Sequence, residues 1–187
     1  MRIIGGTSRG RRLSGPRGAA IRPTADQVKE ALFNLLADRI VGARFLDLFA
    51  GTGNIGLEAL SRGATQATFV ESNPTARRLL EANVRQCGFE RVAEVRPVPV
   101  SRFLKHARGP AYDIVFLDPP YQSQHVQRVL PSLGGDAIVH PHGVVVVEHF
   151  HKTRLGDHIG PLTLVKTRRY GDTCLSVYRR DRAEAWA

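Results

Sequence analysis

The chain has 187 residues, of which 42% are hydrophobic, a length and composition that suit one globular domain and exclude two full ones. It carries 27 Lys and Arg against 17 Asp and Glu, and the formal charge of +10 favours a polyanionic partner such as nucleic acid, with an anionic membrane surface as the alternative. No apolar run reaches the length of a spanning helix or of a signal peptide, so we expect a soluble, cytoplasmic protein.

The first 22 residues contain six arginines and no acidic residue. Glycines such as the pair Gly5-Gly6 favour tight turns, so "RIIGGTSRGRRL" predicts a short basic hairpin. From residue 22 the apolar residues recur with helical spacing as far as Ile40, with Thr24 or Asp26 as the capping residue. We expect a basic arm over residues 1–23 and a single domain over residues 24–187.

Strands and helices alternate through the middle of the chain. Strands are expected at 45–49, 67–71, 92–98, 112–117 and 143–149, and helices at 54–62, 74–87, 101–107 and 123–133. This alternation predicts a mostly parallel sheet with helices on both faces, a Rossmann-like α/β fold. The last segment predicts two antiparallel edge strands around Tyr170-Gly171-Asp172, which brings the expected sheet to seven strands.

A glycine-rich turn is the first chemical motif. "FLDLFAGTGNIGLEAL" places Gly51, Gly53 and Gly56 between a strand and a helix, and Glu71 ends the next expected strand. The pattern is typical of nucleoside binding, because glycines let the backbone approach the ligand while the acid accepts ribose hydroxyls. A nicotinamide dinucleotide would satisfy it too. Asp47 lies inside the preceding strand, where a carboxylate needs a hydrogen bond from the loop or a cationic ligand group.

Several motifs carry a resemblance to a known family. "LDLFAGTGNIGLEALSRGA" with "VESNP" resembles the cofactor site of class I S-adenosylmethionine-dependent methyltransferases, and "DPPY" resembles their amino-methylating motif. The basic start, "RPTADQVKEALFN" and "YGDTCLSVY" are similar to the RsmD family of 16S rRNA guanine-N2 methyltransferases. The resemblance implies methyl transfer from S-adenosylmethionine to the exocyclic 2-amino group of a guanine in 16S rRNA, in an assembled or partly assembled small ribosomal subunit.

The resemblance also implies a set of cofactor-binding residues. Glu71 would hold the ribose, Asp47 and the loop from Gly51 to Gly53 the methionine moiety, and Ser72 or Asn73 would lie near the adenine. The full set is Arg22, Thr24, Asp47, Phe49, Gly51, Gly53, Asn54, Glu71, Ser72, Asn73, Val100 and Ser101. Many class members carry an acid for the adenine amine after the third strand. Pro99, Val100 and Ser101 stand there instead, so we expect backbone atoms to replace it.

"VFLDPPYQ" predicts the catalytic residues Asp118, Pro119, Pro120 and Tyr121. An aromatic amine is a poor nucleophile, and two acceptors aimed at its hydrogens favour a pyramidal nitrogen with an available lone pair. Asp118 and the carbonyl of Pro119 can be those acceptors, because prolines hold the backbone rigid. The ring of Tyr121 can stack on the target base. The expected RNA contacts are Arg9, Arg11, Arg12, Arg168 and Arg169.

Other functions remain open from the residues. Adenine-N6 methylation of DNA uses the same "DPPY" chemistry, although the chain has no room for a sequence-reading domain. A protein glutamine methyltransferase, a nicotinamide-dependent oxidoreductase and a non-enzymatic RNA-binding module are the remaining alternatives. Cys87 and Cys174 stand far apart, and the five histidines between residues 140 and 158 lack zinc-ligand spacing, so we expect no metal. We expect a monomer.

Overall fold

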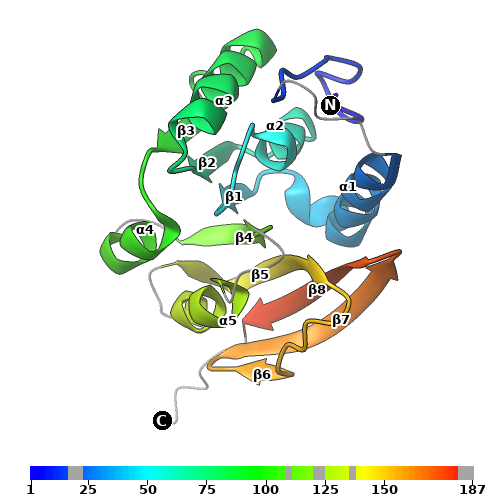
Figure 1. Ribbon diagram of the computed structural model, residues 1–187, viewed down its shortest axis with the longest axis vertical. Coiled ribbons are helices and arrows are strands. Elements are labelled where there is room, and N and C mark those ends of the chain that lie inside the picture. Colours follow the sequence, from blue (N-terminus) through cyan, green and yellow to red (C-terminus); the bar gives the residue numbers. More distant parts are fainter. Residues whose placement is uncertain (17–22, 108–110, 120–124, 135–137, 181–187) are drawn as a thin grey trace.

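The computed structural model describes residues 1–16, 23–107, 111–119, 125–134 and 138–180 (Figure 1). Its strands form one sheet of eight strands in the order β3-β2-β1-β4-β5-β8-β7-β6. The strands are β1 (Arg44–Asp47), β2 (Gln66–Val70), β3 (Ala93–Arg96), β4 (Tyr112–Leu117), β5 (Val139–Phe150), β6 (His158–Ile159), β7 (Leu162–Tyr170) and β8 (Thr173–Arg180).

The strands β3, β2, β1, β4 and β5 are parallel to one another. The sheet continues antiparallel beyond β5, where β8 pairs with β5, β7 with β8, and β6 with β7. The predicted Rossmann-like architecture is therefore confirmed. The expected strand count of seven is wrong, because β6 pairs His158 and Ile159 with the start of β7. Two paired residues carry too little alternation to be recognised as a strand in the sequence.

Helices cover both faces of the sheet. They are α1 (Pro23–Leu36), α2 (Asn54–Ser61), α3 (Pro74–Cys87), α4 (Val100–His106) and α5 (His125–Val129), with 3₁₀ turns η1 (Ala37–Ile40) and η2 (Leu130–Gly134). The predicted first helix continues to residue 40 only as the 3₁₀ turn η1. The helix predicted at 123–133 is likewise split between α5 and η2, and residues 123 and 124 lie outside the described part. None of the helices in the described ranges is both long and apolar enough to cross a membrane.

Two hydrophobic cores lie on opposite faces of the sheet. One is filled from α1, α2 and α3 and includes Leu32, Leu57 and Leu80. The other is filled from α5 and the turn after it and includes Val129 and Leu133, with α4 packed at its edge. Because β1, β4 and β5 are covered on both faces, their residues form near-continuous apolar runs, as expected for buried parallel strands.

The predicted basic hairpin forms at the start of the chain. Ile3 donates its N–H to the carbonyl of Arg11 at 2.9 Å, and Leu13 donates to the carbonyl of Met1 at 3.0 Å. The hairpin packs tightly on the rest of the molecule, because Ile3 and Leu13 are buried in the same core as α1, α2 and α3. The described part of the expected arm, residues 1–16, thus contributes to the core that α1, α2 and α3 fill.

Candidate active site

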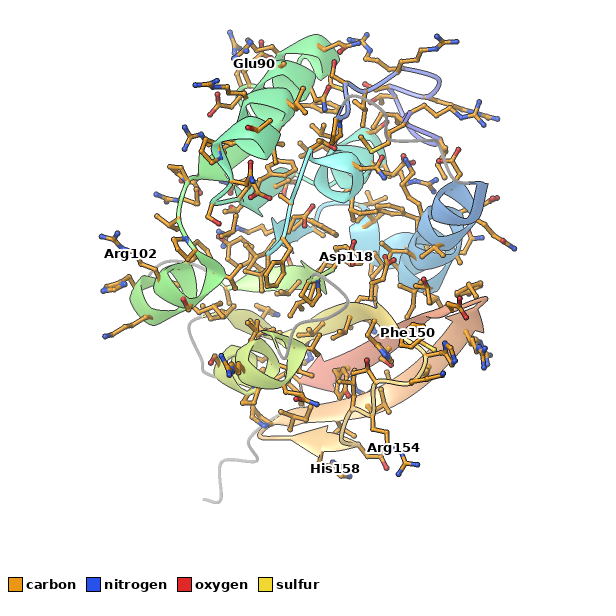
Figure 2. All side chains as sticks on the ribbon, in the orientation of Figure 1. Glu90, Arg102, Asp118, Phe150, Arg154 and His158 are labelled. Atoms are coloured by element: carbon orange, nitrogen blue, oxygen red, sulfur yellow. The ribbon has the colours of Figure 1, made fainter. Side chains whose placement is uncertain are left out.

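Three carboxylates meet where parallel strands end. Asp47 is the last residue of β1, Glu71 follows β2 directly, and Asp118 follows β4 directly. Since β2 and β4 pair with the two sides of β1, the three side chains gather at one edge of the sheet. The chain order reverses between β1 and β4, and ligands of open α/β sheets bind at such a reversal. Figure 2 shows Asp118 beyond the end of β4, on the side where α1 lies.

The glycine turn after β1 is held by two of these acids. Gly51 and Gly53 have φ angles of 53° and 85°, which residues with a Cβ rarely adopt. The N–H of Gly51 donates to Oε2 of Glu71 at 2.8 Å, and the N–H of Gly56 donates to Oδ2 of Asp47 at 3.2 Å. Of the two possibilities expected for a buried Asp47, the hydrogen bond from the glycine segment is present, and a cationic ligand group remains a prediction.

Burial and mutual repulsion make this edge electrostatically unusual. Burial raises the pKa of Asp47 to about 7, the hydrogen bond from Gly56 opposes that rise, and the charges of Asp118 and Glu71 add to it. Burial also raises the pKa of Asp118 to about 6. Asp118 is an exposed residue, so solvent screens part of this effect. A cationic ligand group would relieve this repulsion.

A cavity of about 600 Å³ opens beside Glu71, within the usual range for small-molecule sites. Glu71 and Ser72 form a polar part of its wall, while Phe49, Val70 and Leu104 contribute apolar surface. Among the predicted cofactor residues it is lined by Phe49, Glu71, Ser72, Val100 and Ser101. Lys105 and Arg128 add basic groups to the wall. A largely apolar cavity with a carboxylate in its wall suits a nucleoside, whose base needs apolar walls and whose ribose needs an acceptor.

Two predicted cofactor residues use their side-chain oxygens in the fold. Asn73 caps α3, because its Oδ1 accepts from the backbone N–H groups of Thr75 at 2.9 Å and Ala76 at 3.1 Å. Oδ1 of Asn54 accepts from Nζ of Lys29 at 3.0 Å. A cofactor role for either residue therefore has to rest on its other atoms.

Several predicted residues lie outside the described part of the chain. Pro119 is described and buried beside Asp118, whereas Pro120 and Tyr121 are outside. Arg22 is outside as well, and for Thr24 only the backbone position within α1 is described. These residues remain sequence predictions.

The predicted RNA-contacting arginines are exposed and lie in two places. Arg9, Arg11 and Arg12 belong to the N-terminal hairpin. On β7, Arg168 follows Thr167, which stands in one row with Ser176 of β8, Val147 of β5 and Leu117 of β4. Arg168 is therefore in the row of Asp118, three strand spacings or about 14 Å away along the sheet. Arg169 points to the opposite face, because neighbouring residues of a strand alternate.

A buried charged cluster escaped the sequence prediction. Lys29 of α1 is 1% exposed and Glu58 of α2 is fully buried, with Nζ and Oε2 3.2 Å apart. The Glu58 carboxylate also accepts from Nε of Arg62 and from the backbone N–H groups of Ile4 and Gly5, all at 2.8 Å. The sequence did contain a signal for this pair, because a lysine and a glutamate interrupt helix faces that are otherwise apolar.

Comparison with known proteins matches the chain along its length. The family model described as conserved hypothetical protein 95 matches residues 1–179. "Ribosomal RNA small subunit methyltransferase D" of Haemophilus influenzae is 39% identical over 151 residues, covering 79% of this chain and 78% of that protein. The protein of the same name from Escherichia coli K12 is 34% identical over 183 residues, covering 97% and 90%.

A solved structure agrees with the fold. A protein from Escherichia coli, provisionally described there as a methyltransferase, superposes with a TM-score of 0.84 at 34% identity. The superposition covers 97% of this chain and 98% of that one. The overall fold is thus that of a known architecture.

Proposed function

The chain belongs to the family described as conserved hypothetical protein 95, and from this membership we propose that it methylates small-subunit rRNA on the exocyclic 2-amino group of a guanine. The enzyme uses S-adenosylmethionine as the methyl donor. The resemblance to the RsmD family is confirmed by the relatives named small subunit methyltransferase D. The observation that carries the mechanism is the gathering of Asp47, Glu71 and Asp118 at the ends of β1, β2 and β4.

The charge of the site supports this cofactor over a dinucleotide. A pyrophosphate would meet three carboxylates, of which Asp118 and Glu71 already raise the pKa of Asp47 through their charge. S-adenosylmethionine carries an ammonium and a sulfonium group, and it supplies an electrophilic methyl group to the site. We assign the ribose to Glu71, the base to the cavity beside Val100 and Ser101, and the cationic end to Asp47.

Asp118 and Pro119 prepare the target amine. We assign to them the two acceptors that hold the amine's hydrogens and expose its lone pair to the methyl group. As the new N–C bond forms and the C–S bond breaks, the nitrogen becomes acidic and its proton passes to Asp118 or to water. A pKa of about 6 leaves Asp118 ionised at neutral pH and makes it a stronger proton acceptor than an ordinary carboxylate.

We assign the outer surfaces to the substrate. Tyr121 stacks on the guanine, the arginines of the N-terminal hairpin bind rRNA phosphates, and Arg168 approaches the same RNA from the row of Asp118. The protein acts in the cytoplasm. It acts as a monomer, because a large ribosomal particle offers one target site and an enzyme that approaches it needs no symmetric partner.

Labelled methyl transfer tests the proposal. Unmodified small ribosomal subunits, free rRNA and duplex DNA are incubated with the enzyme and the labelled donor, and the modified nucleoside is identified by mass spectrometry. We expect N2-methylguanosine in rRNA, and a loss of at least about 100-fold in rate for Asp118→Ala with RNA binding retained. Methyladenine formed only in DNA would contradict the guanine assignment, and an active Asp118→Ala would contradict the mechanism.

A further inference from the structure

The side chain of Asn83, in α3, joins the N-terminal hairpin to the glycine turn. It is fully buried. Its Oδ1 accepts from the N–H of Ser14 at 2.8 Å, and its Nδ2 donates to the carbonyl of Ser14 at 3.0 Å. Nδ2 also donates to the carbonyl of Thr52 at 2.9 Å. One amide group thus holds both backbone groups of the residue that follows the hairpin and the central carbonyl of the glycine turn.

The bonded carbonyl belongs to the glycine turn, to which the proposed function assigns the cofactor. Thr52 stands between Gly51, whose N–H donates to Glu71, and Gly53, the residue that precedes α2. Leu80, one turn before Asn83 on α3, packs so closely on Gly53 that a Cβ there would overlap it. Asn83 and Leu80 therefore hold the turn from α3, while Glu71 holds it from the end of β2.

The hairpin is attached firmly enough to transmit a change. Glu58 accepts from Ile4 and Gly5, and Ser61 accepts from the N–H of Ser8 at 2.9 Å and donates to the carbonyl of Gly5 at 2.6 Å. At its other end Met1 contacts the hydroxyl of Thr52 through its sulfur at 3.7 Å. A ligand that restrains the hairpin therefore also restrains the glycine turn, because short, direct contacts join the two.

We propose that Asn83 is a positioning residue that couples RNA binding on the hairpin to cofactor binding on the glycine turn. The inference rests on the proposed function, which assigns RNA to the hairpin and S-adenosylmethionine to the turn. RNA bound to the hairpin further restrains Ser14 and, through Asn83, Thr52, so the cofactor loses less conformational freedom on binding. By reciprocity, the cofactor tightens RNA binding by the same factor.

Equilibrium dialysis of labelled S-adenosylhomocysteine, with and without saturating unmodified small ribosomal subunits, measures the coupling. In the unaltered enzyme we expect the subunits to lower the Kd about fivefold or more. In Asn83→Ala we expect the Kd without RNA to rise roughly tenfold and the RNA effect to vanish. In steady-state assays KM for the donor rises, while kcat at saturating donor stays nearly unchanged.

Gln86→Ala is the matched control. Gln86 lies on the same helix and bonds the carbonyl of Arg12 at 2.9 Å, but it has no bond to the glycine turn. It should keep the fivefold coupling. An Asn83→Ala enzyme that melts at a lower temperature but retains the coupling ratio would reduce Asn83 to a structural residue and overturn the proposal.

A measurement on the unaltered enzyme removes any dependence on a variant that folds. Amide hydrogen exchange at Gly51 and Gly53 should slow when small subunits bind, and unchanged exchange would also overturn the proposal. Absence of methyl transfer in the unaltered enzyme would overturn the proposed function and this inference together. Methyl transfer with a coupling ratio of one would overturn this inference alone.

Discussion

The buried carboxylate of Asp47 lowers the stability of the free enzyme at neutral and alkaline pH. Its carboxylate is 2% exposed, and its pKa of about 7 means that the folded chain holds a proton which the unfolded chain, with an ordinary pKa of 3.8, has released. The folded state therefore binds more protons between these two pH values. Stability from this group is gained as pH falls through about 7 and lost as pH rises.

The pH dependence of thermal unfolding measures this effect. When the pH is lowered from 8.5 to 5.5, the Tm of the ligand-free enzyme should rise by roughly 5 °C relative to the Tm of Asp47→Asn. This corresponds to a gain of about 2 kcal/mol in the free energy of unfolding. The comparison with Asp47→Asn removes the contribution of His149, whose pKa burial lowers and whose effect on stability has the opposite sign. A Tm difference that stays constant over this range would contradict the raised pKa.

The cofactor reverses the preference of the same residue. A cationic ligand favours the ionised carboxylate, so S-adenosylmethionine should bind more tightly as pH rises through about 7. The acid that costs stability in the free enzyme thus becomes a binding group.

At the scale of elements, the packing of the hairpin on α2 decides the shape of the N-terminal region. The buried Lys29–Glu58 pair replaces apolar packing here, and the backbone N–H groups of Ile4 and Gly5 help to satisfy the carboxylate. A buried ion pair adds little net stability, but removing one partner leaves the other uncompensated. The pair therefore specifies where the hairpin lies more than it strengthens the fold.

Two glycines of the hairpin separate backbone strain from packing. Gly6 and Gly10 have φ angles of 75° and 84°, so alanine is strained at both, at about 1 kcal/mol. A Cβ at Gly6 would overlap the carbonyl of Ser61, whereas a Cβ at Gly10 meets no atom within 4 Å. In urea unfolding we expect Gly6→Ala to lose about 3 kcal/mol more than Gly10→Ala. Equal losses would mean that the hairpin is not held against α2.

At the scale of the whole molecule, the charge of +10 governs association with RNA. If the hairpin binds phosphates, replacing Arg9, Arg11 and Arg12 with Ala should lower the slope of log K against log salt by about 2. Replacing the exposed residues Arg78, Arg91 and Arg102 with Ala removes the same charge from outside the hairpin and should change the slope much less. Equal changes for the two triple variants would make the hairpin one part of a diffuse basic surface.

Much of the molecule could be predicted from the sequence, because local patterns determine it. Apolar periodicity identified the alternating strands and helices, and the glycines and acids that end those strands located the site. Parallel strands bring their carboxyl ends to one edge, so Asp47, Glu71 and Asp118 could be placed together without any knowledge of side-chain contacts. The cofactor class and the reaction came from motifs of this kind together with the family resemblance.

The tertiary structure alone decided which partners the buried polar groups take. Asn83 bonds Ser14 across 69 residues of chain and Thr52 across 31, and Lys29 meets Glu58 on another helix. The short strand β6 also exists only because the start of β7 lies beside it. Hydrophobic periodicity shows which face of an element is buried, but a buried hydrogen bond depends on exact distances between elements that no local pattern contains.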